Sequence, residues 1–152
     1  ASQIHFADLN GDGRADYLYV HSDSSVTAYL NGGVSPSGGP IPWTELGLIA
    51  GGVVGGAPAS QIHFADLNGG GRADYVYVHS DSSVTAYLNG GASPSGGPIP
   101  WTELGLIAGG VVGGAPAGQI QFADLNGDGK ADYINVHPDT SVTAYLNGAH
   151  SS

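Results

Sequence analysis

Residues Phe6–Tyr17 read Phe-Ala-Asp-Leu-Asn-Gly-Asp-Gly-Arg-Ala-Asp-Tyr, and the chain carries this stretch three times. It returns with small changes at Phe64–Tyr75 and again at Phe122–Tyr133. Carboxylates, Asn and Gly stand between two runs of strand-forming residues, a pattern that predicts a polar loop joining two β-strands. Because the stretch recurs at a fixed spacing, the fold is expected to consist of repeated units.

The repetition extends far beyond this loop. Residues 1–58 reappear as residues 59–116, and a third, more divergent copy occupies residues 117–152. The first two copies differ at three places, which are Asp12/Gly70, Leu18/Val76 and Val34/Ala92. The chain therefore divides into blade 1 (residues 1–58), blade 2 (59–116) and a partial blade 3 (117–152) of a single repeat domain.

Each full copy reads as four short strands. In the first copy they are predicted at residues 3–7, 17–21, 26–31 and 43–50. These runs are rich in Tyr, Val, Ile and Leu, and Gly-, Ser- and Pro-rich turns separate them. In the second strand Tyr17 and Tyr19 face one way and Leu18 and Val20 the other. Large side chains on both faces predict a sheet that lies between two other sheets, as in a propeller blade.

We therefore expect an all-β fold, a β-propeller of four-stranded blades with about three blades per chain. The third copy lacks the strand that contains Trp43 in blade 1 and Trp101 in blade 2. Three blades do not close a ring, and an open array would leave long exposed edges. The expectation is a homodimer in which two chains close a six-bladed ring. The alternative is that the sequence is a segment of a longer chain.

The charge of the chain is concentrated in the repeated loops. The formal net charge is −10, and eight of the 13 acidic residues lie in those loops. Such a balance predicts cations as partners and argues against nucleic acid, which requires a basic surface. There is no cysteine, and no apolar run is long enough to insert into a membrane as a helix.

The spacing within the loop matches the ligands of one hard cation. Loop positions 1, 3, 5 and 9 carry oxygen side chains and position 7 offers a backbone carbonyl: Asp8, Asn10, Asp12, Asp16 and Arg14. Oxygen ligands without His or Cys suit Ca²⁺, and a Gly at position 6 permits the sharp turn. An EF-hand would need a Glu at position 12, where Tyr19 stands, so the pattern indicates a calcium loop on a β-hairpin.

The other two copies repeat the pattern with one exception. The corresponding residues are Asp66, Asn68, Arg72 and Asp74, then Asp124, Asn126, Asp128, Lys130 and Asp132. Gly70 occupies position 5 of the second loop, so we expect that site to bind calcium more weakly. An ion would neutralise a self-repelling loop and contribute to folding. The alternative is a series of Asn-Gly and Asp-Gly turns without metal.

The quoted stretch resembles the FG-GAP/VCBS repeat, the calcium-loop blade of integrin α-subunit propellers. The resemblance covers nearly the whole chain once the flanking strands are included. It implies a propeller of about six or seven blades, with calcium between the first and second strands of each blade. Several mushroom lectins are similar propellers. Because the family is functionally broad, the resemblance implies a fold rather than a ligand.

The sequence disfavours an enzyme. It contains no nucleophile elbow, zinc-site His pair or phosphate loop, and a polar residue present in every copy is a poor candidate for a unique catalytic site. Repeated histidines such as His21, His79 and His137 are expected to be half-buried at a strand end.

A carbohydrate-binding role, that of a lectin, fits better. Sugars bind through aromatic stacking and a few hydrogen bonds, and repetition raises a modest affinity. The candidate residues are Trp43, Trp101, Tyr29, Tyr87, Tyr145, Asn31, Asn89 and Asn147. The alternative for the Trp and Tyr residues is packing between blades. The rival function is a structural or adhesion propeller, or an accessory protein-binding domain of a secreted hydrolase. Millimolar extracellular calcium would suit such loops, so we expect a secreted protein.

Overall fold

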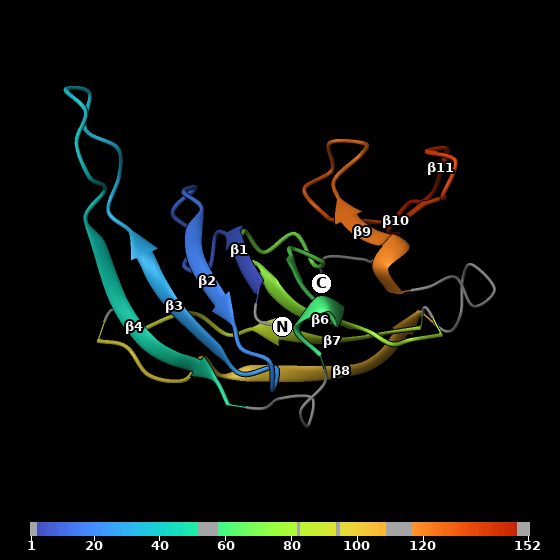
Figure 1. Cartoon of the computed structure of the whole chain (residues 1–152), viewed down its shortest axis with the longest axis horizontal. Helices are drawn as coiled ribbons and strands as arrows, with labels where there is room; N and C mark the ends of the chain where they lie inside the picture. Colours follow the sequence, from blue (N-terminus) through green and yellow to red (C-terminus); the bar gives the residue numbers. More distant parts are fainter. Residues whose placement is uncertain (1–2, 52–57, 82, 94, 109–116, 149–152) are drawn as a thin grey trace.

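The computed structural model describes residues 3–51, 58–81, 83–93, 95–108 and 117–148, which form three antiparallel sheets (Figure 1). Blade 1 consists of β1 (Gln3–Ala7), β2 (Asp16–Val20), β3 (Val26–Asn31) and β4 (Trp43–Ala50). Blade 2 consists of β5 (Ile62–Ala65), β6 (Asp74–Val78), β7 (Val84–Asn89) and β8 (Trp101–Ala108). Blade 3 consists of β9 (Ile120–Ala123), β10 (Asp132–Val136) and β11 (Val142–Tyr145). Short 3₁₀ turns, η1 (Ala59–Gln61) and η2 (Ala117–Gln119), lead into β5 and β9.

Within each sheet the strands follow one another in sequence order, each paired antiparallel with the next. The first strands of the three sheets are neighbours: β1 contacts β5, and β5 contacts β9. The sheets are thus arranged side by side around their first strands, and the hairpin between β3 and β4 projects away from them (Figure 1). This arrangement confirms the prediction of an all-β, propeller-type fold with about three blades.

Three of the four strands expected in blade 1 have the bounds that the sequence predicted. The second begins one residue earlier, at Asp16, because Asp16 pairs with Ala7 at the mouth of the acidic loop. It ends before His21, whose N–H donates to the Ser25 carbonyl in the following turn (2.8 Å). The Gly-rich connectors at residues 52–57 and 109–116 lie outside the described residues.

The fourth strand is more irregular than a simple alternation predicts. The pairing of β3 with β4 shifts register twice, so Leu46 and Ile49 have no directly opposite partner on β3. Gly47, between the two irregularities, has φ 74°, a conformation that glycine adopts without strain. In blade 1 the side chains of both unpaired residues are buried, Leu46 at 4% exposure and Ile49 at 0%.

The hydrophobic core lies between the blades rather than within them. Leu18, Val20 and Val26 of blade 1 pack in one cluster with Tyr75 and Ile62 of blade 2. A second cluster of the same kind joins blades 2 and 3. Blade 2 therefore has a neighbouring sheet on each face, as the two-faced strands predicted, whereas blades 1 and 3 each have one such neighbour among the described residues. In the described part of the chain, no helix is long and apolar enough to cross a membrane.

Candidate metal centres and inter-blade faces

The first acidic loop is closed by its first carboxylate. Asp8 accepts hydrogen bonds from the backbone N–H groups of Gly11 (2.7 Å), Asp12 (3.3 Å) and Gly13 (2.8 Å). Gly11 and Gly13 have φ values of 81° and 85°, which bend the loop around that carboxylate. The loop is therefore held in one shape by its own backbone.

Asn10 and Asp12 form the outer part of the same loop. The Asn10 amide donates to Asp12 Oδ2 (3.2 Å), and Arg14 Nη2 pairs with the same oxygen (2.9 Å). The other oxygen of Asp12 accepts the Arg14 N–H (2.9 Å), and this hydrogen bond lowers the pKa of Asp12. Asp12 is accordingly a carboxylate at neutral pH.

Asp16 is the buried member of the set, with 0% exposure. Its two oxygens accept the N–H groups of Leu9 (2.8 Å) and Asn31 (2.9 Å), which tie the loop to β3. Burial raises the pKa of Asp16, and the negative charges of Asp12 and Asp8 raise it further. A cation in the loop would relieve both effects, because it would offset the burial cost and the mutual repulsion.

The second loop keeps its shape without a carboxylate at position 5. Asp66 accepts the N–H groups of residues 69, 70 and 71 at 2.8, 3.1 and 2.8 Å. Arg72 donates from Nε and Nη2 to the Asn89 carbonyl (3.3 and 3.2 Å), as Arg14 Nε does to the Asn31 carbonyl in blade 1 (3.0 Å). Burial likewise raises the pKa of Asp74. The expected weaker affinity of this site stays a prediction.

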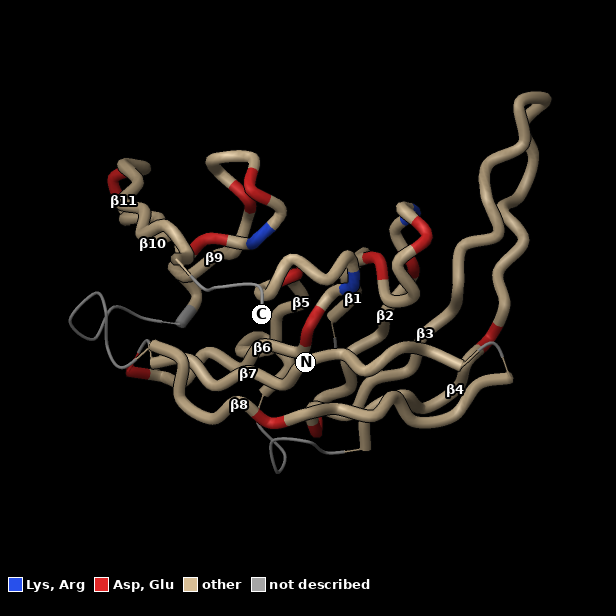
Figure 2. Tube along the Cα trace, turned by 180° about the vertical axis from the view of Figure 1, so that it is seen from behind, with Lys and Arg blue, Asp and Glu red and all other residues tan. Residues whose placement is uncertain are grey.

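The third loop repeats the first. Asp124 accepts from Gly127 (2.7 Å), Asp128 (3.2 Å) and Gly129 (2.8 Å), and the Gly129 hydrogen bond is the main cause that lowers the pKa of Asp124. Lys130 Nζ lies 3.7 Å from Asp128 Oδ2. In each loop the basic residue lies next to acidic residues, as the blue and red segments of Figure 2 show.

The donor chemistry of these loops fits a hard cation. Each offers carboxyl oxygens and an amide oxygen, with no sulfur or imidazole ligand. Among the described residues no three acidic, His or Cys side chains converge on one point. Asp8 Oδ1 accepts two backbone N–H groups, whereas Asp8 Oδ2 and the two oxygens of Asp16 accept one each and keep a further lone pair for an ion.

The first two acidic loops are also attached to the next blade. The Asp8 carbonyl accepts the Ala73 N–H (2.7 Å), and the Leu9 carbonyl accepts the Asn89 amide (2.9 Å). The contact recurs 58 residues later along the chain. There the Asp66 carbonyl accepts the Ala131 N–H (2.7 Å), and the Leu67 carbonyl accepts the Asn147 amide (2.8 Å). The loops thus join neighbouring blades.

Backbone hydrogen bonds assign a role to three residues that the sequence suggested for sugar binding, and two of them, Asn89 and Asn147, donate across this contact. Asn89 is 5% exposed, and its amide nitrogen donates to the carbonyls of Leu9 and Ala73 while its oxygen accepts the Gly91 N–H (2.7 Å). Asn31 and Asn147 occupy the same place in blades 1 and 3. Because the amides of these asparagines already bond to the backbone, we do not include them in the proposed sugar site. Spacing alone did not reveal this, since the Asn89–Leu9 contact spans 80 residues.

The aromatic residues suggested for sugar binding have different surroundings in blades 1 and 2. Trp101 Nε1 donates to the Ile49 carbonyl of blade 1 (3.0 Å), and Tyr75 donates to the Ser24 carbonyl (2.9 Å). Burial raises the pKa of Tyr75 to about 12. Tyr87 is partly buried in the same interface, and burial raises its pKa as well. The packing alternative therefore accounts for Trp101 and Tyr87.

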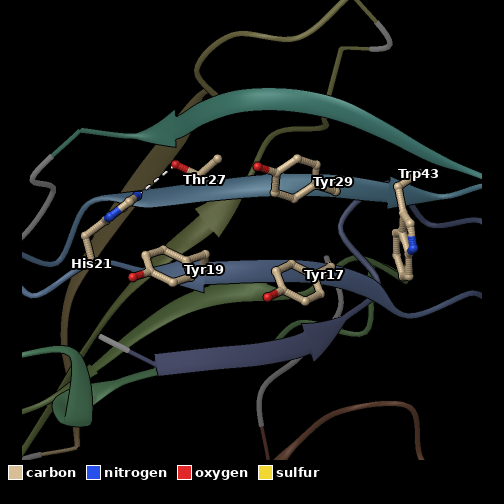
Figure 3. Close-up of a pocket in the computed structure, with 6 residues that line it drawn as sticks. All are labelled: Tyr17, Tyr19, His21, Thr27, Tyr29 and Trp43. Atoms are coloured by element: carbon tan, nitrogen blue, oxygen red, sulfur yellow. Dashed lines mark hydrogen bonds between the residues drawn. The ribbon is translucent and has the colours of Figure 1, made fainter. Parts of the chain in front are cut away.

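On blade 1 the same row of side chains is open. Tyr17, Tyr19, His21, Thr27, Tyr29 and Trp43 line a groove of about 710 Å³ (Figure 3). The Tyr17 ring contacts those of Tyr29 and Trp43 edge to face, at centroid distances of 5.8 and 6.1 Å. Trp43 is 41% exposed. The surface combines flat rings with hydroxyl groups, which is the chemistry that sugar recognition uses. Tyr145, on β11, is 40% exposed at the opposite end of the array.

Repeated antiparallel sheets, each with an acidic loop between its first and second strands, define a repeat protein of the β-propeller class. The profile of the FG-GAP-like repeat family matches residues 8–77 and 66–135, and the chain belongs to this family. Among curated proteins, no sequence matches the chain at a significant level.

Solved structures share the fold. A lectin of Agrocybe aegerita, described as recognising non-reducing terminal N-acetylglucosamine, is 26% identical with a TM-score of 0.56, and covers 97% of this chain and 38% of its own. The Photorhabdus luminescens Tc holotoxin pore is 24% identical with a TM-score of 0.62, covering 93% of this chain and 6% of its own. The TcdB2–TccC3 complex without its hypervariable region is 26% identical (TM-score 0.57; 88% and 6%). The chain thus spans a small part of each structure.

Proposed function

We propose that this chain is a calcium-binding, non-catalytic carbohydrate-binding protein that acts outside the cell. The observation that carries the proposal is the open aromatic groove of blade 1, which is built on a blade whose acidic loop suits calcium. The likeness to a mushroom lectin with the same fold supports it.

Calcium would be held by the oxygen side chains of each loop and the position-7 carbonyl. In the first loop these are Asp8, Asn10, Asp12, Asp16 and the Arg14 carbonyl. The ion would supply positive charge beside the buried Asp16. Because the first two loops also bond to the next blade, binding should stabilise the whole array. Thermal unfolding is expected to shift to higher temperature in calcium than in EDTA. Equal melting temperatures in both would contradict the calcium part.

Sugar would bind at the end of the groove where Trp43 and Tyr29 offer ring faces and Tyr29 also offers a hydroxyl group. A sugar ring stacks its C–H face on an aromatic ring while its hydroxyls hydrogen-bond at the edge. The indole N–H of Trp101 is engaged with the backbone, whereas that of Trp43 has no hydrogen-bond partner among the described residues and is open to a ligand.

A glycan array in millimolar calcium, repeated with EDTA, tests the proposal. We expect binding to one sugar class, lost on chelation and lost in Trp43→Ala. Leu106→Ala is the matched control, since Leu106 is 64% exposed on blade 2 and outside the groove. Folded protein that gives no glycan signal would contradict carbohydrate binding.

The non-catalytic part rests on the repeated histidines. His21, His79 and His137 each bond a Thr hydroxyl on the next strand, at 2.9, 2.7 and 2.7 Å. The same pair in every blade indicates a structural contact between strands. Incubation with the bound glycan is expected to leave it intact, and release of a cleaved product would contradict this.

The second candidate is a protein-binding propeller. The likeness to the TcdB2–TccC3 structure, which contains two named proteins, favours it. In that case the glycan array is silent and the open faces of the array bind a protein partner instead.

A further inference from the structure

The two ends of the blade array are the unmatched halves of a contact that the chain makes twice. In that contact the earlier blade supplies carbonyl acceptors and the later blade supplies donors. Blade 1 gives Asp8, Leu9 and Ser24 carbonyls to the Ala73 N–H, the Asn89 amide and the Tyr75 hydroxyl. Blade 2 gives Asp66 and Leu67 carbonyls to Ala131 and Asn147. The same chemistry therefore recurs wherever two blades meet.

Blade 3 presents the acceptor half, and no described residue bonds to it. The equivalent carbonyls belong to Asp124, Leu125 and Thr140. Thr140 has φ 73°, close to the 71° of Ser24, so its turn has the unusual backbone conformation that presents the Ser24 carbonyl to Tyr75. Such a φ is strained for a β-branched residue.

The apolar side chains of this half are uncovered as well. Leu125 is 53% exposed, whereas its counterparts Leu9 and Leu67 are 0% and 7% exposed. Val142 is 58% exposed, whereas Val26 and Val84 are fully buried. Identical residues are thus buried or exposed according to whether a blade follows.

Blade 1 presents the donor half. The Ala15 N–H and the Tyr17 hydroxyl have no hydrogen-bond partner among the described residues, and the Asn31 amide donates to the Ala15 carbonyl alone (2.9 Å). Ile4 is 43% exposed, while its counterparts Ile62 and Ile120 are fully buried. Phe6 is 62% exposed, whereas Phe64 and Phe122 pack against the clusters between blades.

The side chain at loop position 7 also takes part in the contact between blades. A Cβ placed on Gly11 would lie 3.4 Å from Arg72 Cγ, and one on Gly69 would lie 3.4 Å from Lys130 Cγ. Each basic stem therefore lies over a loop glycine of the preceding blade. Gly127, the equivalent on blade 3, has no described atom within 4 Å of its Cβ position, so its surface is open to a basic stem such as that of Arg14.

We propose that a second copy of this chain docks on these faces, blade 1 of each copy against blade 3 of the other, to close a two-fold ring of six blades. The Ala15 N–H would donate to the Asp124 carbonyl, the Asn31 amide to Leu125 and the Tyr17 hydroxyl to Thr140. Arg14 would cover Gly127. The partner is a second copy because both halves follow the internal contact residue by residue, and because two copies leave neither half open.

The dimer is compatible with a ligand at the edge of the groove. In blade 2, Trp101 and the Gly97 and Ile99 N–H groups bond to carbonyls of β4. Blade 3 has no fourth strand among the described residues, so the docked copy would cover Tyr17 and leave Trp43 open. The inference does not depend on sugar binding.

The mass of the folded chain in millimolar calcium, by light scattering after size exclusion at micromolar concentration, tests the proposal. The expected value is twice the 15.2 kDa of one chain. Leu125→Lys and Phe6→Lys each place a charge in one half of the contact, at positions exposed in the protomer, and are expected to give folded monomers. Leu48→Lys is the matched control and should stay dimeric, because its counterpart Leu106 is 64% exposed even beside a preceding blade.

Mixing the two variants separates this geometry from any other dimer. The Phe6→Lys chain keeps an intact blade 3 face and the Leu125→Lys chain keeps an intact blade 1 face, so the mixture should regain one contact and form a heterodimer. A wild-type monomer, dimeric variants, or a mixture that stays monomeric would overturn the proposal. Circular dichroism of each variant verifies that it is folded. Should one of them unfold, Val142→Lys replaces Leu125→Lys and Ile4→Lys replaces Phe6→Lys in the same test.

Discussion

Asp74 shows how one carboxylate can hold three elements of a blade together. It is 2% exposed, and its two oxygens accept the N–H groups of Leu67 in the acidic loop (2.9 Å) and Asn89 at the end of β7 (2.9 Å). Asp16 and Asp132 make the same pair of contacts in the other blades. The carboxylate at position 9 is therefore a structural anchor whether or not an ion is bound.

We predict that Asp74→Asn destabilises the metal-free protein by about 1–2 kcal/mol. Both oxygens are needed as acceptors, and an amide would place a donor opposite one of the two N–H groups. Chemical denaturation in EDTA measures the effect without any contribution from metal ligation. Glu103→Gln, on the exposed strand β8, is the control and should leave stability unchanged. Equal stability of Asp74→Asn and wild type would contradict the anchor role.

His63 predicts a dependence of stability on pH. Burial, together with the nearby His5, lowers the pKa of His63 to about 4 from 6.5. The unfolded chain then binds the proton more tightly, so stability is full above pH 6.5 and declines as the pH falls toward 4. A shift of this size corresponds to at most about 3 kcal/mol.

His63→Gln should flatten this decline, because blade 3 already carries Gln121 at the equivalent place. His5 has a pKa lowered by burial too, so a double substitution of His5 and His63 should flatten it further. Denaturation midpoints at pH 7, 6, 5 and 4.5 make the comparison. A wild-type midpoint that does not change over this range would contradict the prediction.

At the scale of elements, alternation in the sequence predicted the strands well. Leu18 and Val20 are fully buried where Tyr17 and Tyr19 are partly exposed, as the period of two indicated. What could not be predicted depends on contacts between blades. The register shifts of β4 turn the Leu46 and Ile49 carbonyls toward the next blade, where they accept N–H groups of residues 97 and 99 (both 3.0 Å). A sequence pattern within one blade contains no signal for such contacts.

The spacing of the acidic loops likewise predicted a set of cation ligands. It did not predict that the loops also bond to the next blade. The backbone carbonyls of Asp8 and Leu9 bind blade 2, and any residue type at these positions would offer the same carbonyl. The sequence therefore did not predict that Asn89, at the end of a strand, is buried against the preceding blade, where its amide bonds to the Leu9 carbonyl.

The second loop offers a gain-of-function test. We predict that Gly70→Asp raises the calcium affinity of this loop to that of the first. A Cβ at Gly70 would lie 3.0 Å from Asn68 Oδ1, the end of a side chain that can move, and Gly70 has no positive φ to forbid the change. Calcium-dependent stabilisation of the variant should exceed that of wild type. Gly70→Ala, which adds the Cβ without a carboxylate, is the control, and an equal gain in that variant would contradict the ligand role of position 5.

At the scale of the whole molecule, the array is a set of equivalent contacts with two open ends. The exposure of Ile4 and Leu125, set against their buried counterparts, measures what a neighbouring blade covers. Since the acidic loops lie at every contact between blades, calcium and assembly are expected to act on the same surfaces. Removal of calcium should therefore weaken the association of two copies as well as the stability of one.

Calorimetric titration of calcium into the metal-free protein tests the central claim most directly. The account predicts calcium binding by the folded chain, with two sites of similar affinity, formed by the first and third loops, and a weaker site in the second, where Gly70 stands. A folded protein that takes up no calcium, or one that binds three ions with equal affinity, would contradict it.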